Sequence, residues 1–443
     1  MTTSTAPDAV ASQRQSIPCP PPPRSPEDLG LPFSVVSDLL LRILYFNGSL
    51  AGRELAAHIC IPFPIVEPAL KHLSDEAHIS TAGMRTSDLQ AHESLTAGTQ
   101  WQLTTTGRQR ARELIEVNQY AGPAPVPIDV YTAVARHQAK ADVRVTRDQL
   151  RAALAHLILS DVLHDELGPA ISARHTVFLY GPPGNGKTSI ADACADLLGP
   201  PLFVPRALYA HGEIIRFFDP VVHHPVSLPY LPPHDTRWVP VRRPAVKVGG
   251  ELRPEQLDLG YDQHLGFHEA SLQLKANGGM FLVDDFGRQT RLPPHELLNR
   301  LIVPLEKGVD YLNLPRAGTT LTVPFTTTVI LSTNLRPDEL MDEAFLRRIR
   351  FKVFVPSPTE EQFRAIWHQV CARMNVPYDD AIVTALIEEY YREPGREFRG
   401  VHPRDLLTHV VHAAQFEGRR AELAADLLDV ASNTYFVRKS ERW

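Results

Sequence analysis

The chain has 443 residues, 43% of them hydrophobic, so it is long enough to bury the cores of two or three domains. Its 51 acidic residues outnumber its 45 basic ones, and the formal net charge of -6 excludes a bulk attraction to nucleic acid or to anionic membranes. The four cysteines form no CxxC pair, which argues against a disulfide framework and a zinc site. Because the N-terminus lacks the apolar segment of an export signal and no stretch is long enough to span a membrane, we expect a soluble cytoplasmic protein.

Residues 1–30 are polar and rich in proline, a composition that predicts a disordered arm or, alternatively, a polyproline ligand for a partner. Residues 31–119 then read as a helix ending near Gly48, two short helices, a hairpin and a closing helix. This order of elements predicts a winged-helix-like α+β domain.

The second short helix, FPIVEPALKHLS, would be the recognition helix if this domain bound DNA. It offers only Lys71 and His72 as basic side chains, and the predicted wing adds Arg85. A base-reading helix normally presents Arg, Lys, Asn or Gln to the bases and a basic surface to the phosphates. We therefore favour contact with a protein partner, while DNA binding stays open as the alternative.

The next segment, YAGPAPVPIDV, is rich in proline, glycine and alanine, and we predict a linker over residues 120–140. Thr146 followed by Gln149 predicts a capping box that opens one long amphipathic helix, ending near Gly168. Strands and helices then alternate up to about residue 356, and residues 357–443 are helical in pattern. This order predicts an α/β core with a parallel sheet over residues 141–356, followed by a helical lid.

A glycine-rich loop lies between a predicted strand, residues 176–180, and a predicted helix. The sequence GPPGNGKTS fits a phosphate-binding loop, in which backbone N–H groups and the positive helix N-terminus surround a triphosphate. Its members, all predicted to bind ATP, are Gly181, Pro182, Pro183, Gly184, Asn185, Gly186, Lys187, Thr188 and Ser189. Lys187 would neutralise the terminal phosphates, and the Thr188 hydroxyl would coordinate Mg²⁺.

Two further strands of the predicted sheet end in polar side chains suited to this chemistry. The run FLV ends at Asp284, predicted to hold Mg²⁺, and at Asp285, predicted to polarise the attacking water. The run TTTVILST ends at Asn334, whose amide can bind the terminal phosphate or the water, although an Asn in a simple turn is the plainer interpretation.

Two adjacent arginines, Arg347 and Arg348, follow a short predicted helix. A hydrolysis site needs positive charge on the oxygens that become negative, and these residues are candidates to supply it to a neighbouring subunit. The alternative is an exposed helix end, where Glu343 and Arg347 have the spacing of an ordinary ion pair.

The motifs GPPGNGKTS, FLVDDFG, LSTN, DEAFLRRI and VHPRDLL, in this order, resemble those of the AAA+ ATPases over residues 140–440. The resemblance implies a three-layer αβα P-loop fold with a helical lid, ATP and Mg²⁺ as ligands, and a ring, most simply a hexamer. It implies these roles: Lys187 and Thr188 as Walker A, Asp284 and Asp285 as Walker B, Asn334 as sensor 1, Arg347 and Arg348 as the finger pair, and Arg404 as sensor 2. Longer stretches such as LLNRLIVPLEKGVDYL resemble a bacterial group of predicted AAA ATPases described as having chaperone activity.

Most AAA+ proteins have Glu where this chain has Asp285, so slow hydrolysis is one expectation. Three functions follow: an ATPase that remodels or regulates a macromolecular partner, a nucleotide-gated DNA-binding protein, or a slow ATPase that acts as a switch or scaffold. The first is favoured, because the recognition helix is poor in basic residues.

Residues 206–277 form an insertion between the P-loop segment and the acidic strand, and we expect an exposed loop. Four of its histidines, His211, His223, His224 and His234, lack the spacing of a metal site. The aromatic residues Phe217, Phe218, Tyr230 and Trp238 would face a central pore if the chain forms a ring, or pack the insertion against the sheet. Arg242, Arg243 and Lys247 form its densest basic patch, either a contact for an acidic partner or a solvated group.

Overall fold

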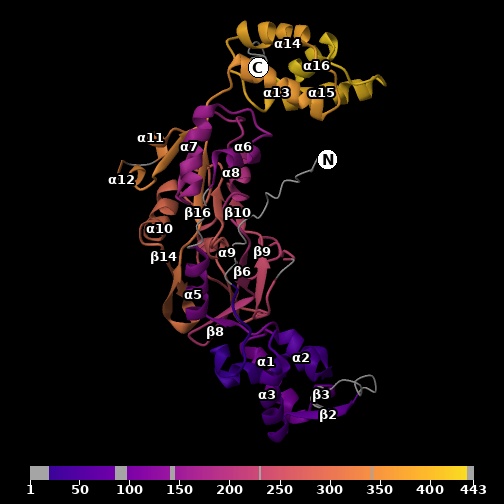
Figure 1. Cartoon of the computed structure of the whole chain (residues 1–443), viewed down its shortest axis with the longest axis vertical. Helices are drawn as coiled ribbons and strands as arrows, with labels where there is room; N and C mark the ends of the chain where they lie inside the picture. The colour runs from indigo at the N-terminus through magenta and orange to yellow at the C-terminus, as the bar shows by residue number, and fades with distance from the viewer. Residues whose placement is uncertain (1–18, 85–96, 140–144, 229–230, 341–342, 437–443) are drawn as a thin grey trace, which may run out of the picture.

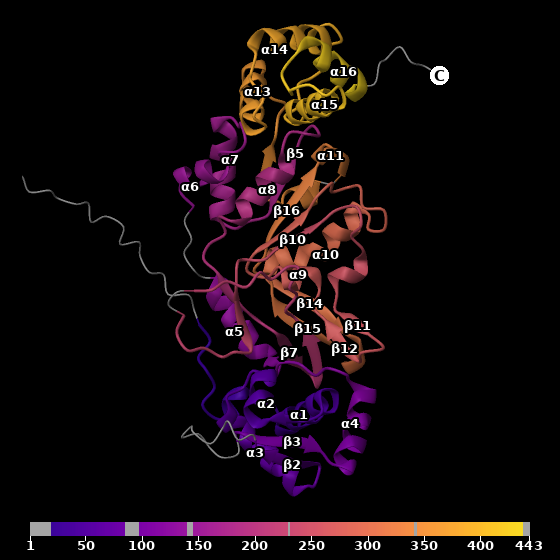
Figure 2. The same cartoon turned by 90° about the vertical axis from the view of Figure 1, so that its right-hand side faces the viewer.

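The computed structural model describes residues 19–84, 97–139, 145–228, 231–340 and 343–436. Three parts follow one another along the long axis of the molecule: an N-terminal helical domain, a central α/β body and a C-terminal helical domain (Figures 1 and 2). The two helical domains therefore lie at opposite ends.

The N-terminal domain contains α1 (Phe33–Asn47), β1 (Leu50–Ala51), α2 (Gly52–Ile59), α3 (Phe63–Asp75), β2 (Ile79–Met84), β3 (Thr99–Leu103) and α4 (Thr105–Val117). The three strands form an antiparallel sheet in the order β1-β3-β2. Apolar residues at helical spacing in α1, among them Leu40 and Ile43, are buried against the other helices. This is the element order expected of a winged helix, and Arg85 lies outside the described residues.

The central body is built on a five-stranded parallel sheet in the order β10-β13-β16-β5-β17. Its strands are β10 (Ala245–Val248), β13 (Met280–Val283), β16 (Thr328–Thr333), β5 (Val177–Tyr180) and β17 (Phe351–Phe354). The strand β5, which enters the glycine-rich loop, thus lies between β17 and β16. The strand β16, which ends near Asn334, lies in turn next to the acidic strand β13. The prediction of an αβα P-loop fold is confirmed.

Alternate residues of the sheet pack against different helix layers. Leu179 and Leu282 contact the layer of α6 (Arg147–Ala153), α7 (Asp161–Ser172) and α8 (Lys187–Ala195), whereas Phe178 and Phe281 face α10 (Pro294–Lys307). Both faces are covered, which is why these strands are short continuous apolar runs.

The insertion is a folded part of the body, so the expectation of an exposed loop is wrong. It contributes β7 (Ala207–Ala210), β8 (Glu213–Arg216), β11 (Gly260–Asp262) and β12 (Phe267–Glu269) to a second sheet, in the order β11-β12-β8-β7-β4. It also supplies β9 (Trp238–Val241), which pairs with β6 (Leu202–Pro205). Two further elements of the insertion are β10, the edge strand of the parallel sheet, and the short helix α9 (Leu272–Lys275). The second sheet lies between the P-loop core and the N-terminal domain (Figure 2).

Residues 120–139 of the predicted linker 120–140 are also part of this body rather than a linker. They form β4 (Val126–Pro127) and α5 (Ile128–Ala139), and the side chains of Val126 and Tyr131 are buried. Pro127 is tolerated because β4 is the edge strand of the second sheet. Likewise, residues 19–30 of the expected disordered arm are packed, since Leu29 is buried and the Pro20 carbonyl accepts a hydrogen bond from the Asp235 backbone.

The single long helix predicted from Thr146 is wrong. Its capping box with Gln149 forms as expected, but α6 ends at Ala153 and α7 begins after Ser160, whose hydroxyl accepts a hydrogen bond from the Leu163 backbone. A second N-cap therefore breaks the helix. The loop between the two helices lines a cavity beside the glycine-rich loop.

The C-terminal domain contains α13 (Glu360–Arg373), α14 (Asp380–Ile387), α15 (His402–Phe416) and α16 (Ala425–Tyr435). Phe363, Trp367 and Tyr391 are fully buried at its centre. Two short helices, α11 (Pro337–Leu340) and α12 (Glu343–Leu346), and a hairpin of β14 (Val309–Leu314) and β15 (Thr319–Pro324) complete the central body.

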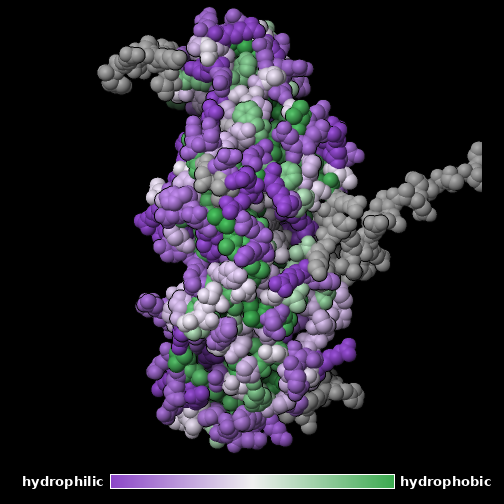
Figure 3. Space-filling view, turned by 90° about the vertical axis from the view of Figure 1, so that its left-hand side faces the viewer, coloured by the Kyte–Doolittle hydropathy of each residue, from purple (hydrophilic) through white to green (hydrophobic). Residues whose placement is uncertain are grey.

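Within the described residues, no helix combines the length and the apolar character that crossing a bilayer requires. On the face shown in Figure 3, hydrophobic and hydrophilic residues are interspersed along the length of the molecule.

Candidate nucleotide-binding site

The glycine-rich loop connects β5 to α8 at the carboxyl end of the sheet. Gly181 has φ 144°, and a Cβ atom there would lie 2.2 Å from the Val355 carbonyl oxygen of the neighbouring strand end. Gly186, with φ 83°, stands directly before the first residue of α8. Only glycine fits both positions, which gives the loop the turn that brings backbone N–H groups together at a helix N-terminus.

Lys187 is buried at the centre of this loop. Its Nζ donates hydrogen bonds to the carbonyl oxygens of Gly181 (3.0 Å) and Pro182 (2.9 Å) and to Asn334 Oδ1 (2.6 Å). Burial lowers the pKa of Lys187, and the carboxylates of Asp284 and Asp285 oppose that shift. The loop thus holds a cation that is partly stripped of water.

The acidic strand end lies beside the loop, because only β16 separates β13 from β5 and the three parallel strands end at the same edge of the sheet. The Thr188 hydroxyl donates a hydrogen bond to Asp284 Oδ2 at 2.7 Å, and Asn334 Nδ2 donates one to Asp285 Oδ1 at 3.0 Å. Asn334 therefore bridges Lys187 and Asp285. The five side chains that the sequence assigned to phosphate, metal and water meet at one edge of the sheet.

Asp285 has an unusual backbone conformation, with φ 46°. Its carbonyl accepts hydrogen bonds from the Arg288 backbone (2.9 Å) and from Gln289 Nε2 (3.3 Å), and the same amide reaches the Asp284 carbonyl (3.2 Å). Asp and Asn tolerate this left-handed region better than other residues with a side chain. Gln289 is a buried support of the turn that the sequence reasoning did not identify.

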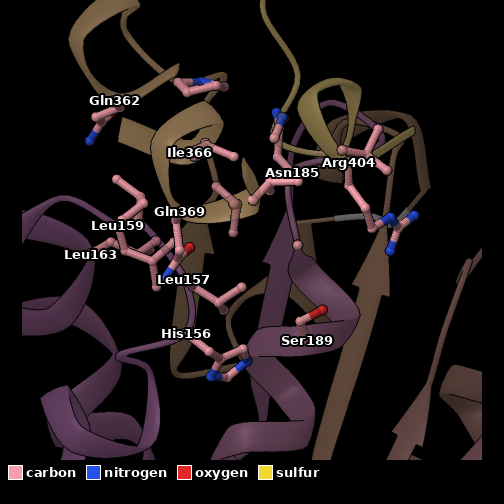
Figure 4. Close-up of a pocket in the computed structure, with 18 of the residues that line it drawn as sticks. His156, Leu157, Leu159, Leu163, Asn185, Ser189, Gln362, Ile366, Gln369 and Arg404 are labelled. Atoms are coloured by element: carbon pink, nitrogen blue, oxygen red, sulfur yellow. The ribbon is translucent and has the colours of Figure 1, made fainter. Parts of the chain in front are cut away.

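A cavity of about 330 Å³ adjoins the loop, between the central body and the C-terminal domain (Figure 4). Its apolar walls come from the α6–α7 loop on one side, with Leu157 and Leu159, and from α13 on the other, with Ile366 and Val370. Gln369 Nε2 donates a hydrogen bond across it to the Ala155 carbonyl (3.4 Å). Sequence reasoning missed these residues, because the two walls are about 200 positions apart and carry no motif.

The remaining loop residues differ in what they face. Gly184, Asn185, Gly186 and Ser189 line the cavity, and the Asn185 side chain is turned toward the C-terminal domain, where it contacts Gly400. Pro183 is exposed at the tip of the loop.

The predicted sensor, Arg404, lines the same cavity from α15. Its side chain is 65% exposed and binds the adjacent Asp405 carboxylate at 3.0 Å. Asp405 in turn accepts a hydrogen bond from the Tyr435 hydroxyl at 3.1 Å. Arg404 is therefore at the cavity but oriented by its own domain.

The two finger candidates lie outside this cluster. Arg347 and Arg348 follow α12 on the connection to β17, and both are exposed. Arg348 Nε binds Glu306 of α10 at 2.5 Å. Their assignment remains a prediction.

The aromatic residues of the insertion do not share one environment. Phe217 and Trp238 are 1% exposed and pack in the core under the second sheet, so the idea that they face a pore is wrong. Phe218 is partly buried on the same cluster, and Tyr230 lies outside the described residues.

The four histidines considered as metal ligands are likewise separate. His223 is buried between the Asp219 backbone and the Lys275 carbonyl, and His211, His224 and His234 lie elsewhere on the insertion. In the part of the chain that the structure describes, no three His, Cys, Asp or Glu side chains gather as metal ligands.

The basic patch of the insertion is largely paired. Arg243 is buried and donates hydrogen bonds to the carbonyls of Pro200 and Gly278, and Lys247 binds Asp192 at 2.6 Å. Arg242 lies 4.0 Å from Asp196.

One family model matches the chain, a domain of unknown function, DUF8689, over residues 359–434. The match covers the C-terminal helical domain only. No functionally curated protein matches the chain in sequence.

Among solved structures, the chain is similar to NtrX from Brucella abortus in complex with ATP, at 15% identity and a TM-score of 0.39, over 63% of this chain and 56% of that one. A structure of NtrX with ADP gives 15% identity and a TM-score of 0.40, over 75% and 68%. A RuvB variant from Thermotoga maritima gives 14% identity and a TM-score of 0.36, over 66% and 70%.

Proposed function

We propose that the chain is an ATPase of the AAA+ type that binds ATP between the P-loop and the helical lid. The observation that carries this proposal is the chain of contacts from Lys187 through Asn334 to Asp285, beside the Thr188–Asp284 contact. A buried cation, a hydroxyl and two carboxylates at the ends of neighbouring parallel strands form the set of groups that phosphoryl transfer requires.

The residues present also fit Mg²⁺. A hydroxyl oxygen and a carboxylate oxygen are the hard ligands that this cation prefers, and Mg²⁺ usually keeps several waters and binds phosphate as well. Thr188 and Asp284 would hold it, and its charge would offset that of the phosphates. Asp285 would orient and polarise the water, and Asn334 would fix the position of Asp285.

The cavity beside the loop supports a nucleotide rather than a simple phosphate. Leu157, Leu159 and Ile366 offer apolar surface to a base, and the loop that opens at Gly184 would receive the phosphates. Because one wall belongs to the lid, base binding would fix the position of the lid.

The partner and the assembly are further parts of the proposal. We infer that the N-terminal domain recruits a protein, since α3 exposes only Lys71 and His72 as basic groups. Arg347 and Arg348, exposed on the body, would complete the site of a neighbouring chain in a ring, most simply a hexamer. A nucleotide-gated DNA-binding protein and a slow ATPase switch or scaffold remain as alternative functions.

The test is ATP binding and turnover by the intact chain with Mg²⁺. We expect binding of a fluorescent ATP analogue by the wild type and a loss of more than tenfold in affinity in Lys187→Ala, because that change removes the buried cation. Asn299→Ala, on the exposed side of α10, is the control. Equal affinity in wild type and Lys187→Ala would reject this site.

A further inference from the structure

The phosphate-binding loop is joined directly to the C-terminal lid. Asn185 Oδ1 accepts a hydrogen bond from the Gly400 backbone N–H at 3.0 Å, and the Gly184 carbonyl accepts one from the Val401 backbone N–H at 2.8 Å. The Asn185 side chain is buried, with 8% of its surface exposed. Neither bond uses a backbone N–H of the loop, so those groups stay available for phosphate.

The fit between the two segments is close. A Cβ atom on Gly184 would lie 2.7 Å from Val401 Cγ1, and one on Gly400 would lie 3.4 Å from the Gly184 carbonyl oxygen. Two glycines facing each other allow the backbones to approach, and this approach sets the lid in one position on the loop.

A third segment meets them at the same point. Asn185 Nδ2 donates a hydrogen bond to Ser357 Oγ at 3.4 Å, and Ser357 belongs to the connection from β17 to α13, the covalent hinge of the lid. Arg399 Nη1 donates to the same oxygen at 2.7 Å, and the hydroxyl donates to Glu397 Oε2 at 3.3 Å. The Ser357 hydroxyl is thus fully used.

We propose that Asn185 is a positioning residue that fixes the lid on the phosphate-binding loop, so that phosphate binding and lid orientation are coupled. The planar amide presents an acceptor to Gly400 and a donor to Ser357 from two different atoms. A hydroxyl has a single oxygen for both bonds, and an apolar side chain can form neither. The inference rests on the proposed function, because it concerns the nucleotide cavity that the lid closes.

The coupling has a direct consequence for binding. The cavity has one wall on the α6–α7 loop and the other on α13, so a lid that moves relative to the loop separates Leu157 from Ile366. Losing two neutral hydrogen bonds is expected to weaken ATP binding about thirtyfold, since each contributes roughly 1 kcal/mol and about 1.4 kcal/mol corresponds to tenfold.

The experiment compares the full-length wild type with Asn185→Ala, Ser357→Ala and the control Asn299→Ala. Amide hydrogen exchange of residues 398–402 in the absence of nucleotide reports lid position without any need for ATP. Titration with a fluorescent ATP analogue then gives the affinity. We expect faster exchange and about thirtyfold weaker binding in Asn185→Ala and no change in the control. A smaller change of about fivefold is expected in Ser357→Ala, which leaves the Asn185–Gly400 hydrogen bond and the Arg399–Glu397 ion pair in place.

Unchanged exchange of residues 398–402 in both Asn185→Ala and Ser357→Ala would overturn the positioning role. Faster exchange with unchanged ATP affinity would overturn the coupling. If the wild type binds no ATP, the proposed function fails, and the exchange comparison still decides whether Asn185 positions the lid. Should Asn185→Ala not fold, Ser357→Ala gives the same two readouts.

Discussion

Replacing Asp285 by Asn isolates the role of one carboxylate in turnover. The change keeps the size of the side chain, keeps an oxygen that can accept the hydrogen bond from Asn334 Nδ2, and suits the left-handed backbone at φ 46°. Because the side chain is exposed, we expect a change of less than about 0.5 kcal/mol in the free energy of unfolding. Lys187 and Thr188 are untouched, so ATP affinity should stay within about threefold.

Turnover should fall much further, since a positioned base or polarising group contributes roughly 10²–10⁴-fold. This corresponds to about 3–5 kcal/mol of the activation barrier. The assay is phosphate release with saturating Mg-ATP, alongside affinity from a fluorescent analogue and stability from urea unfolding. Lys187→Ala, which should lose binding, is the contrasting variant. A turnover in Asp285→Asn within threefold of the wild type, at equal affinity, would refute the assignment of Asp285.

Three other changes test separate parts of the molecule. Asp285→Glu should lower stability by about 1 kcal/mol, because Glu tolerates φ 46° less well, without raising turnover; faster turnover at unchanged stability would contradict this explanation. Arg316 at the β14–β15 turn donates hydrogen bonds to the carbonyls of Val117 (3.0 Å) and Gly266 (3.4 Å), so Arg316→Ala should speed amide hydrogen exchange at the end of α4. Arg112, exposed on α4, gives the control variant Arg112→Ala, which should leave that exchange unchanged. Burial lowers the pKa of His223 in the folded chain to about 4, whereas the unfolded chain has the ordinary histidine pKa of about 6.5. As the pH falls below about 6.5 the unfolded chain therefore takes up a proton before the folded one, and the free energy of unfolding decreases progressively toward pH 4. Between pH 7 and pH 5 the wild type should lose about 2 kcal/mol more than His223→Gln in urea unfolding, and equal losses would show that His223 does not titrate in this way.

The parallel core could be predicted from the sequence because its strands are buried on both faces. Such strands appear as short apolar runs, and each of the three that matter ends in residues with chemistry: Gly181, Asp284 and Asn334. The consecutive parallel strands β5, β16 and β13 bring these ends to one edge of the sheet. The Lys187–Asn334 contact joins the ends of the neighbouring strands β5 and β16, and the Thr188–Asp284 contact reaches across β16 to β13.

Two of the errors have a common physical cause, which is that proline and histidine content says little about burial. Composition alone predicts a linker over residues 120–140 and a loop over residues 206–277. Yet Val126, Tyr131 and Trp238 bury their side chains in one core beneath a second sheet, and that sheet only forms when distant segments pair. The break before Ser160 was hidden because the apolar spacing continues across it, although Ser160 followed by Asp161 is itself an N-cap signal.

The identity of residue 285 illustrates what backbone geometry adds to the motif. From the sequence, an Asp in place of Glu predicts slow hydrolysis, because its carboxylate is one methylene further from the water. The left-handed backbone at residue 285 changes this comparison of Asp with Glu, since it favours Asp or Asn. In this conformation Asp285 Oδ1 lies 3.0 Å from Asn334 Nδ2, and the oxygen of the same Asn334 amide accepts a hydrogen bond from Lys187. The shorter Asp side chain thus suits the left-handed turn in which it lies. Turnover in Asp285→Glu measures whether this backbone conformation, rather than side-chain length, sets the rate of hydrolysis.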